Sequence, residues 1–306
     1  MSLNNQPYPG TAGGQTIKRH RLARFKTRKA KIIYTVLACL VLFGIPVFRL
    51  DLDVRHFAVD TDKLTPGSTI TFVQLSDFHA NNYGRRQHRL IKAIESMSPD
   101  AVLLTGDILD HLIPMNNAIE LVEELASRWP VFYVFGNHEF MSGDDEVFQT
   151  ILENNDVTVL RGAVAEFHAH GNTIQIGGID DLDVSFYRPD HERYWQQLAR
   201  LGELTNPDMY SIILSHRPER IHEFLDFQPN LVLSGHAHGG QWQFPGLLEN
   251  GLFAPNQGFF PRYTNGLYEF GNTQLIVSRG LSRYSPPVPR IFNRPDIIVI
   301  TVSNPA

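Results

Sequence analysis

The sequence predicts an α/β fold, in which short buried strands alternate with amphipathic helices. Two observations support this prediction. From residue 69 onward, short apolar runs alternate with segments of helical periodicity. A polar residue of a type that binds metals follows most of the apolar runs. The composition agrees, because apolar residues make up 42% and charged residues 19% of the 306 residues, as in an ordinary globular protein.

The first 48 residues differ from the rest of the chain. Residues 1–31 are polar and then strongly basic, so we expect a disordered cytoplasmic tail without enough apolar surface to order it. Residues 32–48 carry no charge and are predicted to form a transmembrane signal anchor. The preceding basic cluster argues against a buried core helix, and no small-residue cleavage site or adjacent arginine pair supports a cleaved signal peptide. Residues 49–68 are expected to be a linker that leads into the domain.

The distribution of charge predicts the topology. Because basic residues precede the apolar segment, we expect a single-pass protein of the cell membrane with a cytoplasmic amino terminus and the domain outside the cytoplasm. A formal net charge of −5 gives no reason to expect nucleic acid as a partner. Cys39 is the only cysteine, which excludes intramolecular disulfides and sites built from several thiolates.

Residues 69–306 are expected to form one domain. Short apolar runs predict buried strands at residues 70–75, 101–105, 131–135, 211–214 and 231–233. Apolar residues recur with helical spacing over residues 85–97 and 118–129, which predicts two helices between the first three strands.

Candidate metal ligands follow the first three predicted strands. Asp77, Asp107 and Asn137 each lie just beyond a strand, and successive members of this series are 30 residues apart. Thirty residues correspond to about one strand–helix–strand unit. If the strands are parallel neighbours, the three side chains emerge at one edge of the sheet, where open α/β sheets bind ligands.

Histidines complete this set of candidate ligands. They lie in the same loops or follow later apolar runs, and they are His79, His216, His236 and His238. Imidazole and carboxylate groups together suit Mn, Fe or Zn. The set is too large for one tetrahedral site and is sufficient for two divalent metal ions that share a carboxylate.

Taken together, the motifs resemble those of the calcineurin-like metallophosphoesterase superfamily, over residues 70–302. The motifs are D-x-H at 77–79, G-D-x-x-D at 106–110, G-N-H-E at 136–139, an isolated histidine at 216 and G-H-x-H at 235–238. A longer string, GHAHGGQ at 235–241, and the later N-G-L, S-R-G and R-P-D triplets are similar to a narrower group. That group comprises membrane-associated bacterial phosphoesterases, some of which act on UDP-diacylglucosamine.

The resemblance implies both the architecture and the residue roles. The implied fold is a four-layer sandwich of two β-sheets flanked by helices, preceded here by the transmembrane helix. The first metal would be held by Asp77, His79 and His238. The second would be held by Asn137, His216 and His236, with Asp107 bridging the two. His138 would be a catalytic histidine without a metal, near the leaving group.

The implied activity is hydrolysis of a phosphoester by a hydroxide bound to two metals. A membrane anchor favours a phosphodiesterase or pyrophosphatase that acts on a lipid-linked or envelope substrate. A phosphomonoesterase, including a phosphoprotein phosphatase, uses the same metal pair and stays open as an alternative. A binding scaffold without catalysis is disfavoured, because no motif residue is degraded. Asp110 could orient a ligand or equally be a surface carboxylate. Arg85 or Arg86 could contact a phosphate or be solvated residues in the first turn of a helix, and His111 is expected to lie outside the site.

Overall fold

The structure is a computed structural model that describes residues 27–36, 47–188, 191–283 and 289–305. The chain divides into two compact units, Met1–Phe48 and Arg49–Ala306. In the first unit, residues 27–36 are helical, which corrects our expectation of disorder for residues 27–31. That stretch contains arginine, alanine and lysines, which favour a helix. The rest of the expected tail, and residues 37–46 of the expected anchor, lie outside the described residues. Within the described part of the chain, no helix has both the length and the apolar character needed to cross a membrane.

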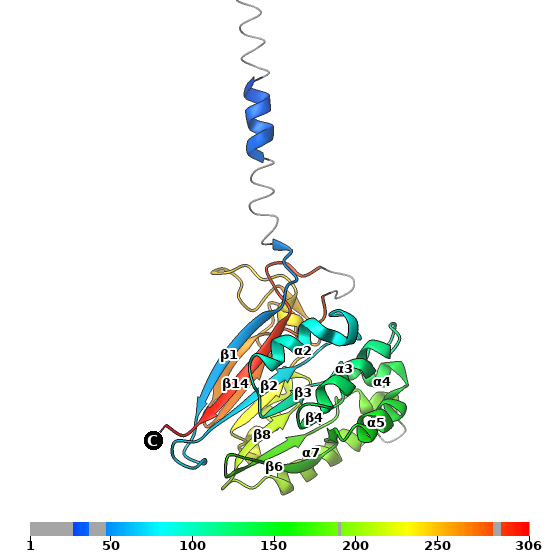
Figure 1. The fold of residues 1–306 in the computed structure, drawn as a ribbon, viewed down its shortest axis with the longest axis vertical. Coiled ribbons are helices and arrows are strands. Elements are labelled where there is room, and N and C mark those ends of the chain that lie inside the picture. The colour runs from blue at the N-terminus through cyan, green and yellow to red at the C-terminus, as the bar shows by residue number, and fades with distance from the viewer. Residues whose placement is uncertain (1–26, 37–46, 189–190, 284–288, 306) are drawn as a thin grey trace, which may run out of the picture. The chain divides into compact units, whose positions relative to one another are not determined.

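Two mixed β-sheets form the second unit (Figure 1). The first sheet has the strands, in spatial order, β1 Asp53–Asp60, β14 Asp296–Ser303, β2 Thr69–Leu75, β3 Ala101–Leu104, β4 Val131–Tyr133 and β5 Thr158–Val159. Strands β2, β3 and β4 are parallel neighbours, which is the condition under which Asp77, Asp107 and Asn137 emerge at one edge of the sheet. Strand β14 is antiparallel to β2 and parallel to β1. Strands β1 and β14 therefore run in the direction opposite to β2, β3 and β4.

The second sheet is also mixed and has six strands. Its strands, in spatial order, are β12 Gly266–Phe270, β13 Thr273–Val277, β9 Leu231–Ser234, β8 Tyr210–Leu214, β7 Asn172–Gly178 and β6 Ala163–Ala169. The central strands β13, β9, β8 and β7 are parallel, and the outer strands β12 and β6 are antiparallel to their neighbours. A separate pair, β10 Phe253–Ala254 and β11 Gly258–Phe259, lies in the long loop between β9 and β12.

Alternate residues of the central strands pack on opposite faces of the sheet. In β2, Ile70 and Phe72 belong to a buried cluster with Ile176 of β7 and other residues of both sheets, so this cluster lies between the sheets. Val73 and Leu75, on the other face of β2, belong to a second buried cluster that includes the apolar faces of the helices. Those helices are α2 His88–Glu95, α3 Asn116–Ala126, α4 Asn137–Ser142, α5 Asp145–Asn154, α6 Val184–Tyr187 and α7 Arg193–Leu204.

Two segments differ from the sequence prediction. Asp53–Asp60, expected to be part of a linker, forms β1 at the edge of the first sheet. The pattern missed it because an edge strand alternates half-buried and exposed residues and lacks a continuous apolar run. The helix expected over residues 85–97 begins later, at His88. Gln87 has a left-handed backbone, and its side-chain oxygen accepts the N–H of Tyr83, so the regular helix does not extend to the residues before His88.

Candidate metal centre

Five of the predicted ligands share an uncommon backbone conformation. Their φ angles are positive: 49° for Asp77, 48° for His79, 53° for Asp107, 65° for His236 and 46° for His238. Positive φ costs free energy for residues other than glycine and is concentrated at functional sites. The turns that follow β2, β3 and β9 therefore hold these side chains in place at the expense of backbone strain.

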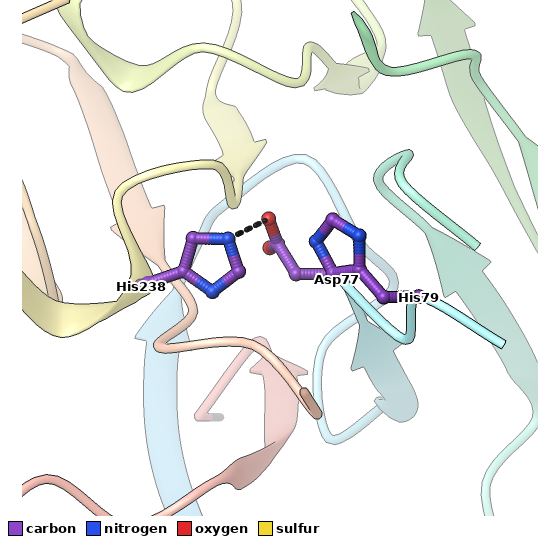
Figure 2. Close-up of side chains that lie close together, drawn as sticks. All are labelled: Asp77, His79 and His238. Atoms are coloured by element: carbon purple, nitrogen blue, oxygen red, sulfur yellow. Dashed lines mark ion pairs between the residues drawn. The ribbon is translucent and has the colours of Figure 1, made fainter. Parts of the chain in front are cut away.

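Asp77, His79 and His238 form a first cluster. Their potential ligand atoms all lie within 4.8 Å of one another. Figure 2 shows the Asp77 carboxylate between the rings of His79 and His238, with His238 Nε2 at 3.5 Å from Asp77 Oδ1. All three side chains are buried. Residues from the turns after β2 and β9, more than 150 positions apart in the chain, thus meet at one point.

Asp107, His216 and His236 form a second cluster with the same 4.8 Å limit. His216 Nε2 lies 3.1 Å from both Asp107 Oδ2 and His236 Nδ1. Burial lowers the pKa of His216, but the negative charges of Asp107, Asp77 and Asp181 together outweigh burial and raise it to about 10. Burial and the positive charge of His216 lower the pKa of His236 to about 3. The carboxylate of this cluster therefore attracts positive charge, which is what a metal cation supplies.

Asp107 lies between the two clusters. Its Oδ2 atom is 3.1 Å from His216 Nε2 in the second cluster and 3.7 Å from His79 Nε2 in the first. Its Oδ1 atom accepts the backbone N–H of His138 at 2.8 Å. The Oδ2 atom thus faces His216 of the second cluster and His79 of the first. This arrangement suits a carboxylate shared by two metals.

The unpaired polar atoms of the site test whether it fits metal ions. His79 Nε2 and Asn137 Oδ1 are buried and have no hydrogen-bond partner among the described residues. Buried polar atoms are nearly always paired, so two orphans in one site require an explanation. Both atoms are of kinds that bind metals, and the donor set of carboxylate, amide oxygen and imidazole fits a pair of divalent ions.

His138 lies against the first cluster. It forms a group with His79 and Asp107 whose ligand atoms are within 4.8 Å of one another. Its Nδ1 atom is 3.5 Å from Asp110 Oδ2 and 3.0 Å from His111 Nδ1. Burial lowers the pKa of His138, but the negative charges of Asp107 and Asp110 outweigh it and raise this pKa to about 9.

Asp110 and His111 thus lie beside the centre. Asp110 Oδ2 is also 3.1 Å from His79 Nδ1, so one carboxylate contacts two histidines. Our sequence analysis weighed an orienting role for Asp110 equally with a surface position. It assigned no role to His111, because no motif includes that residue.

Glu139 ties the loops of the site together through the backbone. Its carboxylate is fully buried and accepts the N–H groups of Gly136 at 2.7 Å, Leu109 at 2.8 Å and Asp107 at 3.0 Å. The loops after β3 and β4 are therefore held in a fixed register. The G-N-H-E motif contained this residue, but its role became apparent only from the structure.

Close packing explains two glycines of the motifs. A Cβ atom at Gly136 would overlap the Asp107 carboxylate, and one at Gly235 would overlap Ser76 and Asp77. The candidate ligand Asp107 thus packs directly against the backbone of Gly136, and Asp77 packs against the backbone of Gly235.

Three supporting contacts have no signal in the sequence. Arg217 forms a buried two-pronged ion pair with Asp181, next to His216. Asn256 Oδ1 lies 2.7 Å from His236 Nε2. Arg290, which is fully buried, has Nη2 at 3.4 Å from His238 Nδ1. The last two come from loops, where neither periodicity nor spacing indicates a neighbour.

Comparison with known proteins gives a consistent picture. Residues 70–240 match the sequence profile of the family described as calcineurin-like phosphoesterase. The uncharacterized metallophosphoesterase YkuE of Bacillus subtilis (strain 168) is 31% identical over 238 residues, which are 76% of this chain and 78% of that protein. A Bos taurus protein named transmembrane protein with metallophosphoesterase domain is 28% identical over 301 residues, which are 94% of this chain and 64% of that protein.

Among solved structures, a dimetal phosphatase from Danio rerio is similar, with 16% identity and a TM-score of 0.48 over 71% of this chain and 89% of that one. The family profile covers more than half of the chain and includes the five motifs from D-x-H at 77–79 to G-H-x-H at 235–238. The chain therefore belongs to the calcineurin-like phosphoesterase family, whose members are hydrolases of phosphoester bonds that use a dimetal centre.

Proposed function

We propose that this chain is a two-metal phosphodiesterase or pyrophosphatase that acts on a lipid-linked or envelope substrate at a membrane. The observation that supports it most is the position of Asp107, whose Oδ2 atom lies 3.1 Å from His216 Nε2 and 3.7 Å from His79 Nε2. A carboxylate between two histidine clusters suits a pair of cations far better than a single one.

The residues that would hold the metals are those of the two clusters. Asp77, His79 and His238 would hold the first metal, Asn137, His216 and His236 would hold the second, and Asp107 would serve both. The ligand set suits Mn, Fe or Zn. Two such ions would lower the pKa of a bound water to near neutrality and offset negative charge on the phosphoryl oxygens.

His138 is the proposed proton donor to the leaving group. Its Nδ1 atom faces Asp110 and His111, at 3.5 and 3.0 Å, and Nε2 is the ring nitrogen that we assign to the substrate. Asp110 fixes the ring orientation and favours its protonated form through its negative charge. A histidine in this role contributes typically about 10²–10⁴ to the rate.

Membrane attachment through residues 32–48 is part of the proposal. The uncharged segment and the basic residues before it support a single span with the amino terminus in the cytoplasm and the catalytic domain, residues 69–306 with β1 added, outside. Protease treatment of intact spheroplasts tests this topology. Cleavage of the domain is expected, and complete protection of the domain would reverse the orientation.

The activity is tested on the full chain purified in detergent. Elemental analysis should find two metal ions per chain, and turnover of bis-p-nitrophenyl phosphate should exceed that of p-nitrophenyl phosphate. The reverse preference would favour a phosphomonoesterase or phosphoprotein phosphatase at the same centre. Two bound metals without turnover of either ester would make the chain a binding scaffold.

A further inference from the structure

Exposed apolar side chains gather in the loop of residues 244–261, called the apolar loop below. Leu247 is 86% exposed, and Phe259 and Phe260 are each 71% exposed. Phe253 is also exposed, and its ring packs on that of Phe259 with centroids 5.5 Å apart. Residues 251–261 contain no charged residue. A contiguous apolar surface of this kind usually marks an interaction site.

The loop is held in a defined shape. Phe253 pairs with Phe259 in the β10–β11 ladder, and the Phe260 N–H donates to the Leu252 carbonyl at 2.9 Å. The Gln257 side chain accepts the N–H of Tyr263 at 2.9 Å and donates to its carbonyl at 2.7 Å. The phenylalanines are therefore exposed because the loop directs them away from the core, and not because the segment lacks structure.

The apolar loop contacts the metal centre directly. Asn256, at the turn between β10 and β11, has its Oδ1 atom 2.7 Å from His236 Nε2. The Leu252 N–H donates to the carbonyl of Gly240 at 2.9 Å, two residues beyond His238. Whatever binds the exposed side of this loop is therefore brought next to the proposed catalytic site.

The same edge of the domain contains the first residues after the apolar segment 32–48. Gln243, just before the loop, donates its N–H to the Ile291 carbonyl at 2.9 Å. Arg294, three residues further on, bonds Asp51 at 2.6 Å and Asp53 at 3.0 Å. Figure 1 shows the start of β1 and the loop before β12 at the same end of the sheets. An anchor formed by residues 32–48 would therefore join the domain at the edge that carries the apolar loop.

Cationic side chains follow another turn of the metal centre. The segment after the Asp77–His79 turn lines a surface hollow of about 660 Å³ with Arg85, Arg86 and Arg89. Glu95 and Glu124 also line it, and Arg86 is paired with Glu124, so the excess positive charge is moderate. Aromatic side chains combined with nearby cations are typical of surfaces that bind anionic lipid headgroups.

We propose that the apolar loop is a membrane-binding element that inserts Leu247, Phe259 and Phe260 into the interface of a phospholipid bilayer beside the metal centre. The position of the loop at the edge where the apolar segment joins the domain favours a bilayer over a second copy of the chain. The proposal goes beyond the proposed hydrolysis, because it concerns the surface to which the domain docks and holds whichever phosphoester is cleaved.

The depth of the loop can be measured on the full chain in vesicles of phosphatidylcholine and phosphatidylglycerol. In a Cys39→Ser background, a nitroxide is attached at Phe259→Cys or, as a control, at Asp62→Cys. Asp62 is exposed and follows β1, at the opposite end of the sheet from the metal centre. We expect the label at 259 to collide severalfold less with a water-soluble nickel chelate, and severalfold more with oxygen, than the label at 62.

Two outcomes would overturn the proposal. Equal access of the nickel chelate to both labels would mean that the loop stays in water although the anchor holds the domain nearby. A label at 259 that is shielded from the chelate and from oxygen would mean contact with protein, as in a pair of chains.

A double variant adds a second measurement. Phe259→Ser with Phe260→Ser should return a label at Leu247→Cys to solvent, whereas circular dichroism, metal content and turnover of p-nitrophenyl phosphate should stay unchanged. A label at 247 that stays at the same depth would contradict joint insertion of the loop. Because soluble-ester turnover is measured in the same samples, loss of hydrolysis with an inserted loop would refute the proposed function and leave this proposal standing.

Discussion

The two halves of the proposed metal centre are supported in different ways. In the first half, the second ring nitrogen of His79 lies 3.1 Å from the carboxylate of Asp110. In the second half, the corresponding nitrogen of His216 lies 2.7 Å from the backbone carbonyl of Thr105. A carboxylate partner makes an imidazole a more basic ligand than a carbonyl partner does.

This difference has a structural origin. Thr105 directly follows β3, so the sheet itself orients His216, whereas Asp110 lies in a loop beyond the sheet. His216 is also more deeply buried than His79. His216 of the second half is thus oriented by a central strand, whereas His79 of the first half depends on a side chain that substitution can alter.

The largest effect is expected for Asp107→Ala, because Asp107 is the residue common to both halves. Its loss removes the carboxylate that both proposed metals would share, so activity should become undetectable and metal content should fall well below two ions per chain. Elemental analysis and turnover of bis-p-nitrophenyl phosphate measure both. Asp144→Ala, an exposed aspartate before α5, is the matched control. Wild-type turnover in Asp107→Ala would show that the halves do not share this carboxylate.

The next largest effect is expected for His138→Ala. His138 is linked to the first half because Asp110 contacts both His138 and His79. The proposed loss of a proton donor should lower turnover by about 10²–10⁴. Metal content should stay at the wild-type value, because His138 is not a proposed ligand. If metal content and rate fall together, His138 binds a metal and the first half has a further ligand.

Asp110→Asn tests the comparison between the halves. The substitution keeps the shape of the side chain and removes the charge beside His79, so the affinity for one metal should fall by about 10–100-fold. The affinity for the other metal should not change, since Thr105 supports His216. Stepwise metal titration followed by calorimetry separates the two. Glu166→Gln, which alters an exposed carboxylate near His168 on β6, serves as the control. Equal weakening of both metals would remove the distinction between the halves.

The sequence predicted the part of this site that depends on strand ends. Asp77, Asp107 and Asn137 follow buried parallel strands at regular spacing, and the topology of such strands brings their ends to one edge. The histidines after β8 and β9 reach the same edge from the second sheet for the same reason. Local apolar patterning and the general rules of α/β topology are sufficient for these residues.

The remaining parts of the site depend on contacts that no local pattern encodes. Asn256 and Arg290 come from long loops, and which ligand they approach depends on how those loops return to the sheet. His111 meets His138 because the loops after β3 and β4 converge, which periodicity does not indicate. Strand β1 was missed because it is an edge strand whose pairing with β14 joins residues more than 240 positions apart.

The smallest effect on activity, and the one that acts on both halves alike, is expected for Glu139→Gln. Glu139 accepts three backbone N–H groups with its two carboxylate oxygens, and glutamine would turn an N–H₂ donor toward at least one of them. An unsatisfied buried group costs about 1–3 kcal/mol. For a domain of this size, each kcal/mol lowers the melting temperature by about 2–4 °C.

Because Glu139 holds the Asp107 loop rather than one histidine, both metal affinities should change by the same small factor, in contrast to Asp110→Asn. Differential scanning calorimetry and the same metal titration measure this, with Glu146→Gln on the exposed face of α5 as the control. An unchanged melting temperature would mean that the two loops keep their register without the carboxylate, and a selective loss of one metal would mean that Glu139 serves only one half.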